Sequence, residues 1–239
     1  MMKIKHRPPA GNTRWGVSTG RNICGIITNK MGRLVQFESW AERSLLLRLE
    51  RDRSVTDYSS QPERFEYVDT QGKWHGYTPD FIVWRGQERI EIHEVTVSER
   101  RERPEIKLRE QAGIAVCRQR GWHYLVHTEH SLPQGSEQAN LLALFRFRPT
   151  VYADTAVVAQ AQERLERQSP LPLHVLLAEI SDELALPKPQ VAAALGHMLW
   201  HGQLQTDLQQ LLFADGHPSI KALVWLPGLK EGNGDTGNA

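Results

Sequence analysis

The sequence predicts an α/β domain built on a mixed sheet flanked by helices, followed by a smaller helical domain, with the division after residue 148. Two observations lead to this prediction. Up to Arg148, short extended patterns surround two longer helical patterns, which is typical of helices packed against a sheet. Beyond Arg148 the apolar spacing is helical throughout. The 239 residues, 40% hydrophobic and 24% charged, are enough to bury a core and are typical of a soluble globular protein.

The first domain, residues 1–148, is expected to begin with a basic arm and two short strands, in "NICGIIT" and "LVQFES". A helix from Ser39 to about Arg51 follows, because Trp40, Leu45 and Leu49 contribute to an apolar stripe at helical spacing. This helix is the first of the two that should cover the sheet.

Extended segments are predicted next, over residues 57–69, 77–84 and 89–97, with Gly72 in the turn between the first two. Pro104 suits the first turn of a helix and Gly121 suits its end, so a second long helix is predicted between them. The stretch "WHYLVHTE" is the expected final strand of the domain.

The second domain, residues 149–239, contains three helical patterns, "TAVVAQAQERLERQ", "PLHVLLAEISDELAL" and "KPQVAAALGHMLWHGQLQT", the last ending at Gly202. The second and third, joined by a short turn and followed by "QLQTDLQQLLF", are typical of a winged helix-turn-helix, although any small helical bundle gives similar stripes. DNA reading and docking of a protein partner are alternative uses of this domain. The residues expected at the start or on the exposed face of the recognition helix are Lys188, Pro189, Gln190 and His197.

Charge and cysteine content restrict the possible functions. The net charge is +1, but residues 1–53 hold eleven Lys or Arg against four Asp or Glu, so this segment could meet phosphates, or simply form a loose arm and a solvated helix face. With two cysteines and no Cys-x-x-Cys motif, the sequence predicts a reducing cytoplasm and no zinc site. No apolar run is long enough for a membrane helix, and the first residues lack the apolar core of a signal peptide.

The stretch "YTPDFIVWRGQERIEIHEVTV" raises the main functional question, because Glu94 lies inside an apolar strand pattern. Burial of an ionised carboxylate costs several kcal/mol unless it is paired or binds a metal, and Asp80 is the obvious neighbour. Strand alternation places Glu94 and His93 on opposite faces without showing which face is wet. An edge strand with solvated acids is the alternative interpretation.

Several motifs, in order, resemble the TnsA family: "FESWAERSLL", "SQP", "YTPDFIV", "IHEVTV" and "GWHYLVHTE". Proteins of this family look like restriction endonucleases and are the subunits of heteromeric transposases that cut the non-transferred strand at transposon ends. The resemblance extends over most of residues 20–130, and the helical second domain matches the family's pattern. It implies a DNA endonuclease that acts on transposon ends with a DDE-type transposase subunit and an AAA+ ATPase regulator.

The resemblance also assigns roles to three acids. The helix glutamate of the family falls on Glu42, the strand aspartate on Asp80, and the first residue of the (Glu/Gln)-x-Lys element on Glu94. Phosphodiester hydrolysis calls for a hard cation, and Mg²⁺, or Mn²⁺ in its place, takes carboxylate oxygens as ligands. We therefore expect Asp80 and Glu94 to bind the metal, and Glu42 to bind or orient it.

One position departs from the family pattern: the lysine two residues after Glu94 is Thr96. Lys107 is the first candidate to replace it, with the loop arginines Arg100, Arg101 and Arg103 behind it, although Lys107 could equally be an ordinary surface lysine. His93 is a possible base, but its phase favours a core or surface role. Two other functions stay open: a catalytically silent DNA- or transposase-binding subunit, and a stand-alone restriction or repair nuclease.

Overall fold

The computed structural model describes residues 24–69, 71–86 and 88–228, and the chain divides into two compact units, Met1–Pro133 and Gln134–Ala239. The division therefore lies earlier than residue 148. Helix α4 (Gly135–Phe145), which the sequence does not predict, belongs to the second unit. Its Asn140 donates to the backbone carbonyls of Leu208 and Gln210 and accepts from the Leu212 amide. The predicted basic arm lies outside the described residues.

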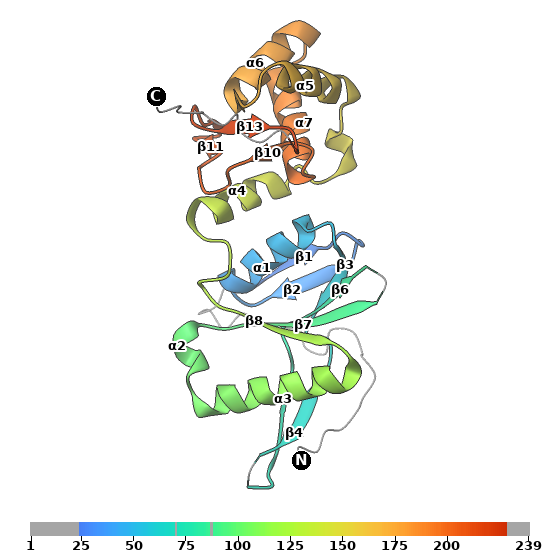
Figure 1. The fold of residues 1–239 in the computed structure, drawn as a ribbon, viewed down its shortest axis with the longest axis vertical. Coiled ribbons are helices and arrows are strands. Elements are labelled where there is room, and N and C mark those ends of the chain that lie inside the picture. Colours follow the sequence, from blue (N-terminus) through green and yellow to red (C-terminus); the bar gives the residue numbers. More distant parts are fainter. Residues whose placement is uncertain (1–23, 70, 87, 229–239) are drawn as a thin grey trace, which may run out of the picture. The chain divides into compact units, whose positions relative to one another are not determined.

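The first unit is built on a four-stranded mixed sheet (Figure 1). Its strands, in spatial order, are β3 (Val55–Ser60), β6 (Phe81–Arg85), β7 (Arg89–Val95) and β8 (His123–His127). β3, β6 and β7 are antiparallel neighbours, whereas β8 is parallel to β7. A parallel pair needs a crossover connection, and α2 (Ser98–Arg101) and α3 (Pro104–Arg120) supply it. Because β7 is an interior strand, the edge-strand interpretation of Glu94 is wrong.

Helix α1 (Trp40–Arg51) covers one face of the sheet. Ser39 caps its N-terminus, since the Ser39 side chain accepts a hydrogen bond from the Glu42 amide. The apolar stripe of α1 packs against the side chains of β3 and β6 that point to this face. The buried residues of this core include Leu45, Leu46, Leu49, Tyr58, Phe81 and Val83.

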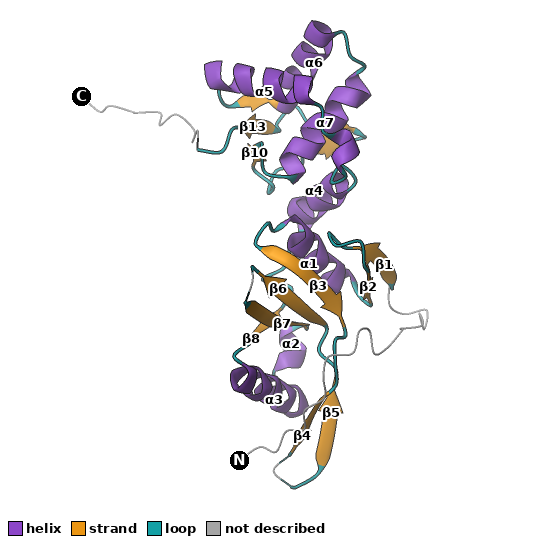
Figure 2. Ribbon diagram, turned by 90° about the vertical axis from the view of Figure 1, so that its right-hand side faces the viewer, coloured by secondary structure: helices purple, strands orange, loops and turns teal. Residues whose placement is uncertain are grey.

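Helix α3 covers the opposite face, so that the sheet lies between α1 and α3 (Figure 2). Pro104 occupies its first turn and Gly121, with φ of 70°, ends it, as the sequence predicts. This second core includes Ile82, Ile92, Ala112, Val116 and Cys117. Both faces of β7 are therefore buried, which explains why its sequence alternation could not identify a wet face.

Two hairpins complete the first unit: β1 (Gly25–Thr28) with β2 (Leu34–Phe37), and β4 (Phe65–Val68) with β5 (Trp74–Tyr77). The extended segment predicted over residues 57–69 is thus divided between β3 and β4. The segment predicted over 77–84 is divided as well, because β5 ends at Tyr77 and β6 begins at Phe81. Asp80 lies at the entry to β6, which fixes the position of the candidate site.

The second unit contains α4, the 3-10 turn Thr150–Tyr152, α5 (Thr155–Arg167), α6 (Leu173–Leu184) and α7 (Lys188–Trp200). Very short strands accompany these helices: β9 (Leu171–Pro172), β10 (Gln205–Thr206) and β13 (Leu223–Trp225) form a three-stranded antiparallel sheet, and β11 (Phe213–Ala214) pairs with β12 (His217–Pro218). The expectation of an entirely helical pattern is therefore wrong, because strands of two or three residues carry no periodic signal.

His197 of α7 does not lie on the exposed face predicted for it. Its side chain is buried, and its Nδ1 is 2.8 Å from the backbone carbonyl of Phe147. Lys188, Pro189 and Gln190 are exposed at the start of the helix, where Gln190 donates to Asp154. None of the helices in the described part of the chain is long and apolar enough to cross a membrane.

Candidate active site

Asp80 is held at the start of β6 by two backbone contacts. The Gln61 amide donates to its carbonyl oxygen at 2.7 Å, and the Val95 amide donates to its carboxylate Oδ2, also at 2.7 Å. Val95 lies on the neighbouring strand directly after Glu94. The hydrogen bond therefore directs the Asp80 carboxylate toward the end of β7, where Glu94 is located.

Glu94 is 3% exposed and points to the same face of the sheet as Ile92, toward α3. Burial raises the pKa of Glu94 well above its usual range, and the nearby charge of Asp80 raises it further. Burial also raises the pKa of Asp80, although the hydrogen bonds from Val95 and from the Glu94 carboxyl oppose this effect. Burial therefore disfavours full ionisation of both acids.

Arg109 is the cation that the structure places beside this pair. Its Nη2 lies 4.0 Å from Glu94 Oε2, and its guanidinium carbon is 5.4 Å from the centre of the Tyr77 ring. The charge of Arg109 lowers the pKa of Glu94 and of Asp80, against the larger effect of burial. The sequence does carry a signal for this residue: Arg109 is three and four positions before the buried Ala112 and Gly113, on the helix face that meets the sheet.

Lys107 has the environment of a surface lysine, which is the alternative that the sequence left open. It is exposed, and its Nζ donates to Glu102 at 2.7 Å. Two residues on a helix are about 200° apart around its axis, so Lys107 and Arg109 face different sides of α3. Arg100, Arg101 and Arg103 are exposed, and Arg101 pairs with Glu110. Among the described contacts of these cations, only that of Arg109 reaches Glu94.

Two tyrosines form an apolar wall around Glu94. Tyr77 donates to the hydroxyl of Tyr124 at 3.5 Å, and burial raises the pKa of both phenols, with Glu94 contributing in each case. Gly113 allows α3 to approach this pair, because a Cβ atom at that position would collide with the Tyr77 hydroxyl and the Tyr124 ring. The wall therefore excludes water from one side of the acid pair.

Glu42 is near the pair but is engaged in a capping box at the start of α1. Its Oε2 accepts from the Glu38 amide at 2.8 Å and its Oε1 accepts from the Ser39 hydroxyl at 2.9 Å. Burial, together with the charge of Asp80, raises the pKa of Glu42 to about 7. Glu38 is a fourth acid, missed in the sequence, whose charge also acts on Asp80; Gln61 holds it at 2.9 Å.

The acid pair suits a hard cation in its chemistry. Glu94 Oε1 is buried and accepts no hydrogen bond from the described residues, and the crowded carboxylates would ionise more readily beside a divalent ion. Within the described part of the chain, no group of three or more His, Cys, Asp or Glu side chains is arranged to hold a metal. The arrangement thus offers two carboxylates, which is the number that Mg²⁺ commonly takes when substrate and water complete its shell.

The neighbours of Glu94 along β7 have other roles. His93 is 2% exposed and points to the face covered by α1, where its Nε2 lies 2.9 Å from Glu91, so it is a core histidine. Thr96 follows the end of the strand and donates its amide to the His127 carbonyl at 2.9 Å. Neither side chain brings a positive charge to Glu94.

The fold and the site together define a mixed α/β domain with an acid pair at the meeting point of two neighbouring strands. Residues 52–129, about a third of the chain, match the family model described as TnsA-like endonuclease N terminal. The resemblance stated from the motifs is confirmed over this segment, which is similar to an endonuclease domain. It contains Asp80, Glu94, Thr96 and Arg109, while Glu42 precedes it. No curated protein matches the chain.

Proposed function

We propose that this protein is the metal-dependent DNA endonuclease subunit of a heteromeric transposase and hydrolyses the non-transferred strand at transposon ends. The observation that supports this most directly is the Asp80–Glu94 pair, held by the Val95 amide, inside the segment that matches the endonuclease family. Two carboxylates this close together need a compensating cation when both are ionised. Phosphodiester hydrolysis by a nuclease uses such a cation.

In this proposal Asp80 and Glu94 are the residues that hold Mg²⁺ or Mn²⁺. When bound, such an ion neutralises charge on the phosphate and favours ionisation of the attacking water. The chain itself orients Asp80 through the Val95 amide and excludes water on the tyrosine side. Glu42 would act from α1 as a ligand or orienting group, and to bind a metal it would release at least one of its two capping hydrogen bonds.

Arg109 takes the place of the strand lysine that Thr96 replaces. A guanidinium is always charged and offers several donors, so it can neutralise a phosphate oxygen as an ammonium can. Its position over Tyr77 and beside Glu94 limits where it can point. Lys107, which pairs with Glu102 at the surface, is the weaker candidate for this role.

In this proposal the second unit docks the nuclease domain onto the other components of the transposase complex. The order α5, β9, α6, α7, β10, hairpin and β13 supports a winged-helix-like domain. Its exposed helix start carries Lys188 but few other cations, so we propose docking within a complex of a DDE-type transposase, an AAA+ ATPase regulator and transposon-end DNA in the cytoplasm. Cleavage should then depend on those partners.

The decisive experiment is calorimetry with Mn²⁺ and Mg²⁺ on the wild type, Asp80→Asn and Glu94→Gln, followed by cleavage of an end-containing DNA with the partner present. We expect both variants to lose metal binding and cleavage. Arg118→Ala, at an exposed position of α3, is the control and should behave as wild type. Unchanged metal binding in Asp80→Asn would remove the proposed site.

A catalytically silent DNA- or transposase-binding subunit is the second candidate. Thr96 in place of the family lysine favours it. The same experiment separates the two functions. A wild type that assembles with DNA and transposase but neither binds Mn²⁺ nor cuts would be the silent subunit.

A further inference from the structure

A second polar site lies at the far end of the sheet from Asp80. A pocket of about 550 Å³ opens where β3 begins and β6 ends. Its lining includes three guanidinium groups, two hydroxyl groups and one apolar side chain, from Arg53, Arg85, Arg89, Ser54, Thr56 and Leu125. Pockets of this volume accommodate small ligands or parts of larger ones.

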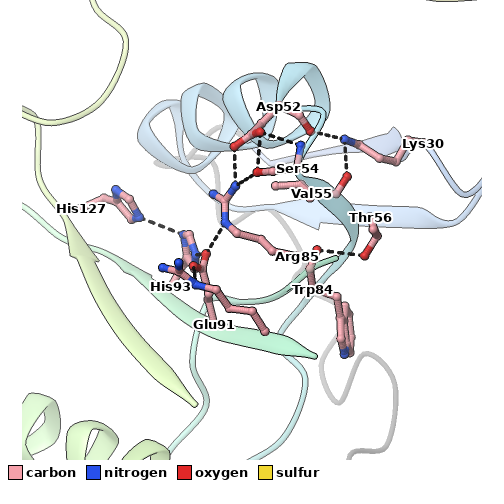
Figure 3. Close-up of polar contacts among 11 residues, drawn as sticks. Lys30, Asp52, Ser54, Val55, Thr56, Trp84, Arg85, Glu91, His93 and His127 are labelled. Carbon is pink, nitrogen blue, oxygen red and sulfur yellow. Dashed lines mark hydrogen bonds and ion pairs between the residues drawn. The ribbon is translucent and has the colours of Figure 1, made fainter. Parts of the chain in front are cut away.

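Arg85 is fixed in this pocket by acids on both sides. Its Nη1 donates to Asp52 Oδ2 and Ser54 Oγ, each at 2.5 Å, and its Nε donates to Glu91 Oε2 at 2.7 Å. Figure 3 shows the Arg85 side chain between Asp52 and Glu91. These contacts use Nε and Nη1. Nη2 is therefore the guanidinium nitrogen for which the described residues provide no acceptor. A fixed guanidinium loses little freedom when it binds a ligand.

Glu91 is inside the pocket wall but does not cancel its positive charge. It is 1% exposed and accepts from Arg85, from Arg89 at 2.7 Å and from His93. Burial opposes its ionisation, but the contacts with His93 and Arg85 lower its pKa to about 2. The carboxylate is therefore satisfied by protein donors, and three guanidinium groups face two carboxylates, those of Glu91 and Asp52.

The remaining positive charge faces solvent. Arg53 is exposed and forms no ion pair with any described residue, and the Arg89 side chain is 54% exposed although its Nε contacts Glu91. Ser54 and Thr56 are exposed at the same rim, but their hydroxyl groups already donate within the protein, to Asp52 Oδ1 and to the Trp84 carbonyl. Guanidinium donors thus approach the pocket from the segment before β3, from the end of β6 and from the start of β7.

We propose that this pocket binds a phosphate group. A tetrahedral phosphate offers acceptor oxygens in several directions and suits guanidinium donors that approach from three segments of the chain, whereas the two oxygens of a carboxylate lie in one plane with its carbon. The phosphate belongs to a nucleic-acid backbone or to a free nucleotide. The site goes beyond the proposed nuclease function, because it lies at the opposite end of β6 from Asp80 and on the face that Glu91 shares, not the face of Glu94.

The test compares the full-length wild type with Arg53→Ala/Arg89→Ala, with Arg53→Ala alone and with Arg118→Ala as an exposed control arginine. Inorganic phosphate and AMP are titrated by calorimetry. We expect the wild type to bind and the double variant to bind at least about 10-fold more weakly, since charge-assisted donors are lost. Arg53→Ala, which removes no described contact, should weaken binding without affecting the fold, and Arg118→Ala should leave it unchanged.

A second measurement identifies the source of the phosphate. The affinity for duplex DNA is measured against salt concentration, where each lost phosphate contact lowers the slope by about 0.9. A lower slope in the double variant assigns the pocket to a DNA backbone, and an unchanged slope with lost AMP binding assigns it to a nucleotide. Failure of the wild type to bind phosphate, AMP and DNA at this pocket, or an equal loss in Arg118→Ala, overturns the proposal.

Mn²⁺ binding is recorded in parallel, to separate this pocket from the proposed metal site. It should survive in Arg53→Ala/Arg89→Ala and be lost in Asp80→Asn, so that the two sites fail independently.

Discussion

Arg109 Nη2 lies 4.0 Å from Glu94 Oε2, so the positive charge beside the acid pair comes from α3 and not from the strand that carries Glu94. Thr96, at the strand position where the resembling family has lysine, has no charge to contribute. Helix α3 comes close enough because Gly113 has no Cβ to collide with Tyr77 and Tyr124. The helix and the strand therefore contribute opposite charges to one site.

Arg109→Ala should reduce cleavage in the reconstituted reaction by about 100-fold, because one well-placed charged donor supplies roughly 3 kcal/mol of transition-state stabilisation. Mn²⁺ affinity should not fall, since the change removes a positive charge near the proposed metal ligands. Single-turnover cleavage and calorimetry measure the two effects. Lys107→Ala is the matched control and should cut normally, because Lys107 pairs with Glu102 at the surface.

Thr96→Lys in the Arg109→Ala background should restore part of the lost rate, since it returns a cation to the strand. A normal rate in Arg109→Ala would contradict the role given to this arginine. A reduced rate in Lys107→Ala alone would return the role to Lys107.

Glu42 should make the metal-free protein less stable as pH rises. Its pKa is about 7 in the folded state, against an ordinary value of 4.5, so the folded protein holds the proton more tightly than the unfolded chain. The stabilisation is complete below pH 4.5 and is lost as pH rises to 7. In Glu42→Gln this loss should be smaller by about 1–2 kcal/mol, after allowance for partial exposure.

Glutamine keeps the capping box, whereas Glu42→Ala should be less stable than Glu42→Gln by about 1 kcal/mol at every pH through loss of the cap. Urea unfolding at pH 4.5, 6 and 8 measures both variants. Parallel pH profiles for wild type and Glu42→Gln would show that the carboxyl titrates normally.

The sequence was sufficient to predict the acid pair and the two long helices of the first unit, for identifiable reasons. Asp80 and Glu94 stand out because an acid beside or inside an apolar strand needs a partner. Pro104 and Gly121 define a helix by their backbone preferences, which do not depend on distant contacts. The structure bears out these local rules, including the end of α3 at Gly121.

Other features of the fold and the site were not predicted from the sequence. Arg109 was missed because a partly buried arginine on the sheet-facing side of a helix contradicts the usual preference for apolar residues there. Helix α4 joins the second unit through Asn140, whose partners are about 70 positions later. The capping contacts of Glu42 are typical of the Ser-x-x-Glu spacing of Ser39 and Glu42, whereas the resemblance to the family assigns Glu42 only to the metal.

Gly113→Ala should destabilise the first unit by about 1–3 kcal/mol, although alanine is the better helix former by roughly 1 kcal/mol. The added Cβ would collide with Tyr77 and Tyr124, and α3 would have to move away from the sheet. Thermal unfolding measures the loss. Gln119→Ala, at an exposed position of the same helix, should change stability by less than about 0.5 kcal/mol. Equal or greater stability of Gly113→Ala would show that the helix has room to move.

The acid pair should make the stability of the first unit depend on metal and pH together. The pKa values of Asp80 and Glu94 are both raised by burial, so in EDTA their stabilising protons are lost as pH rises above the ordinary carboxyl range. At pH 8 without metal, Asp80→Asn and Glu94→Gln should therefore melt higher than wild type. About 1 kcal/mol corresponds to roughly 4 °C for a domain of this size.

Mn²⁺ should reverse this order, because it binds the ionised pair and stabilises the folded state by about 2.7 kcal/mol at 100 times its dissociation constant. The wild type should gain melting temperature, whereas the two variants should not respond. Arg118→Ala should follow wild type in both conditions. Differential scanning calorimetry at pH 5 and pH 8, with EDTA or Mn²⁺, gives all of these values. If the metal raised the melting temperature of wild type and of both variants equally, the ion would bind elsewhere, and the carboxylates of Asp80 and Glu94 would have only a structural role.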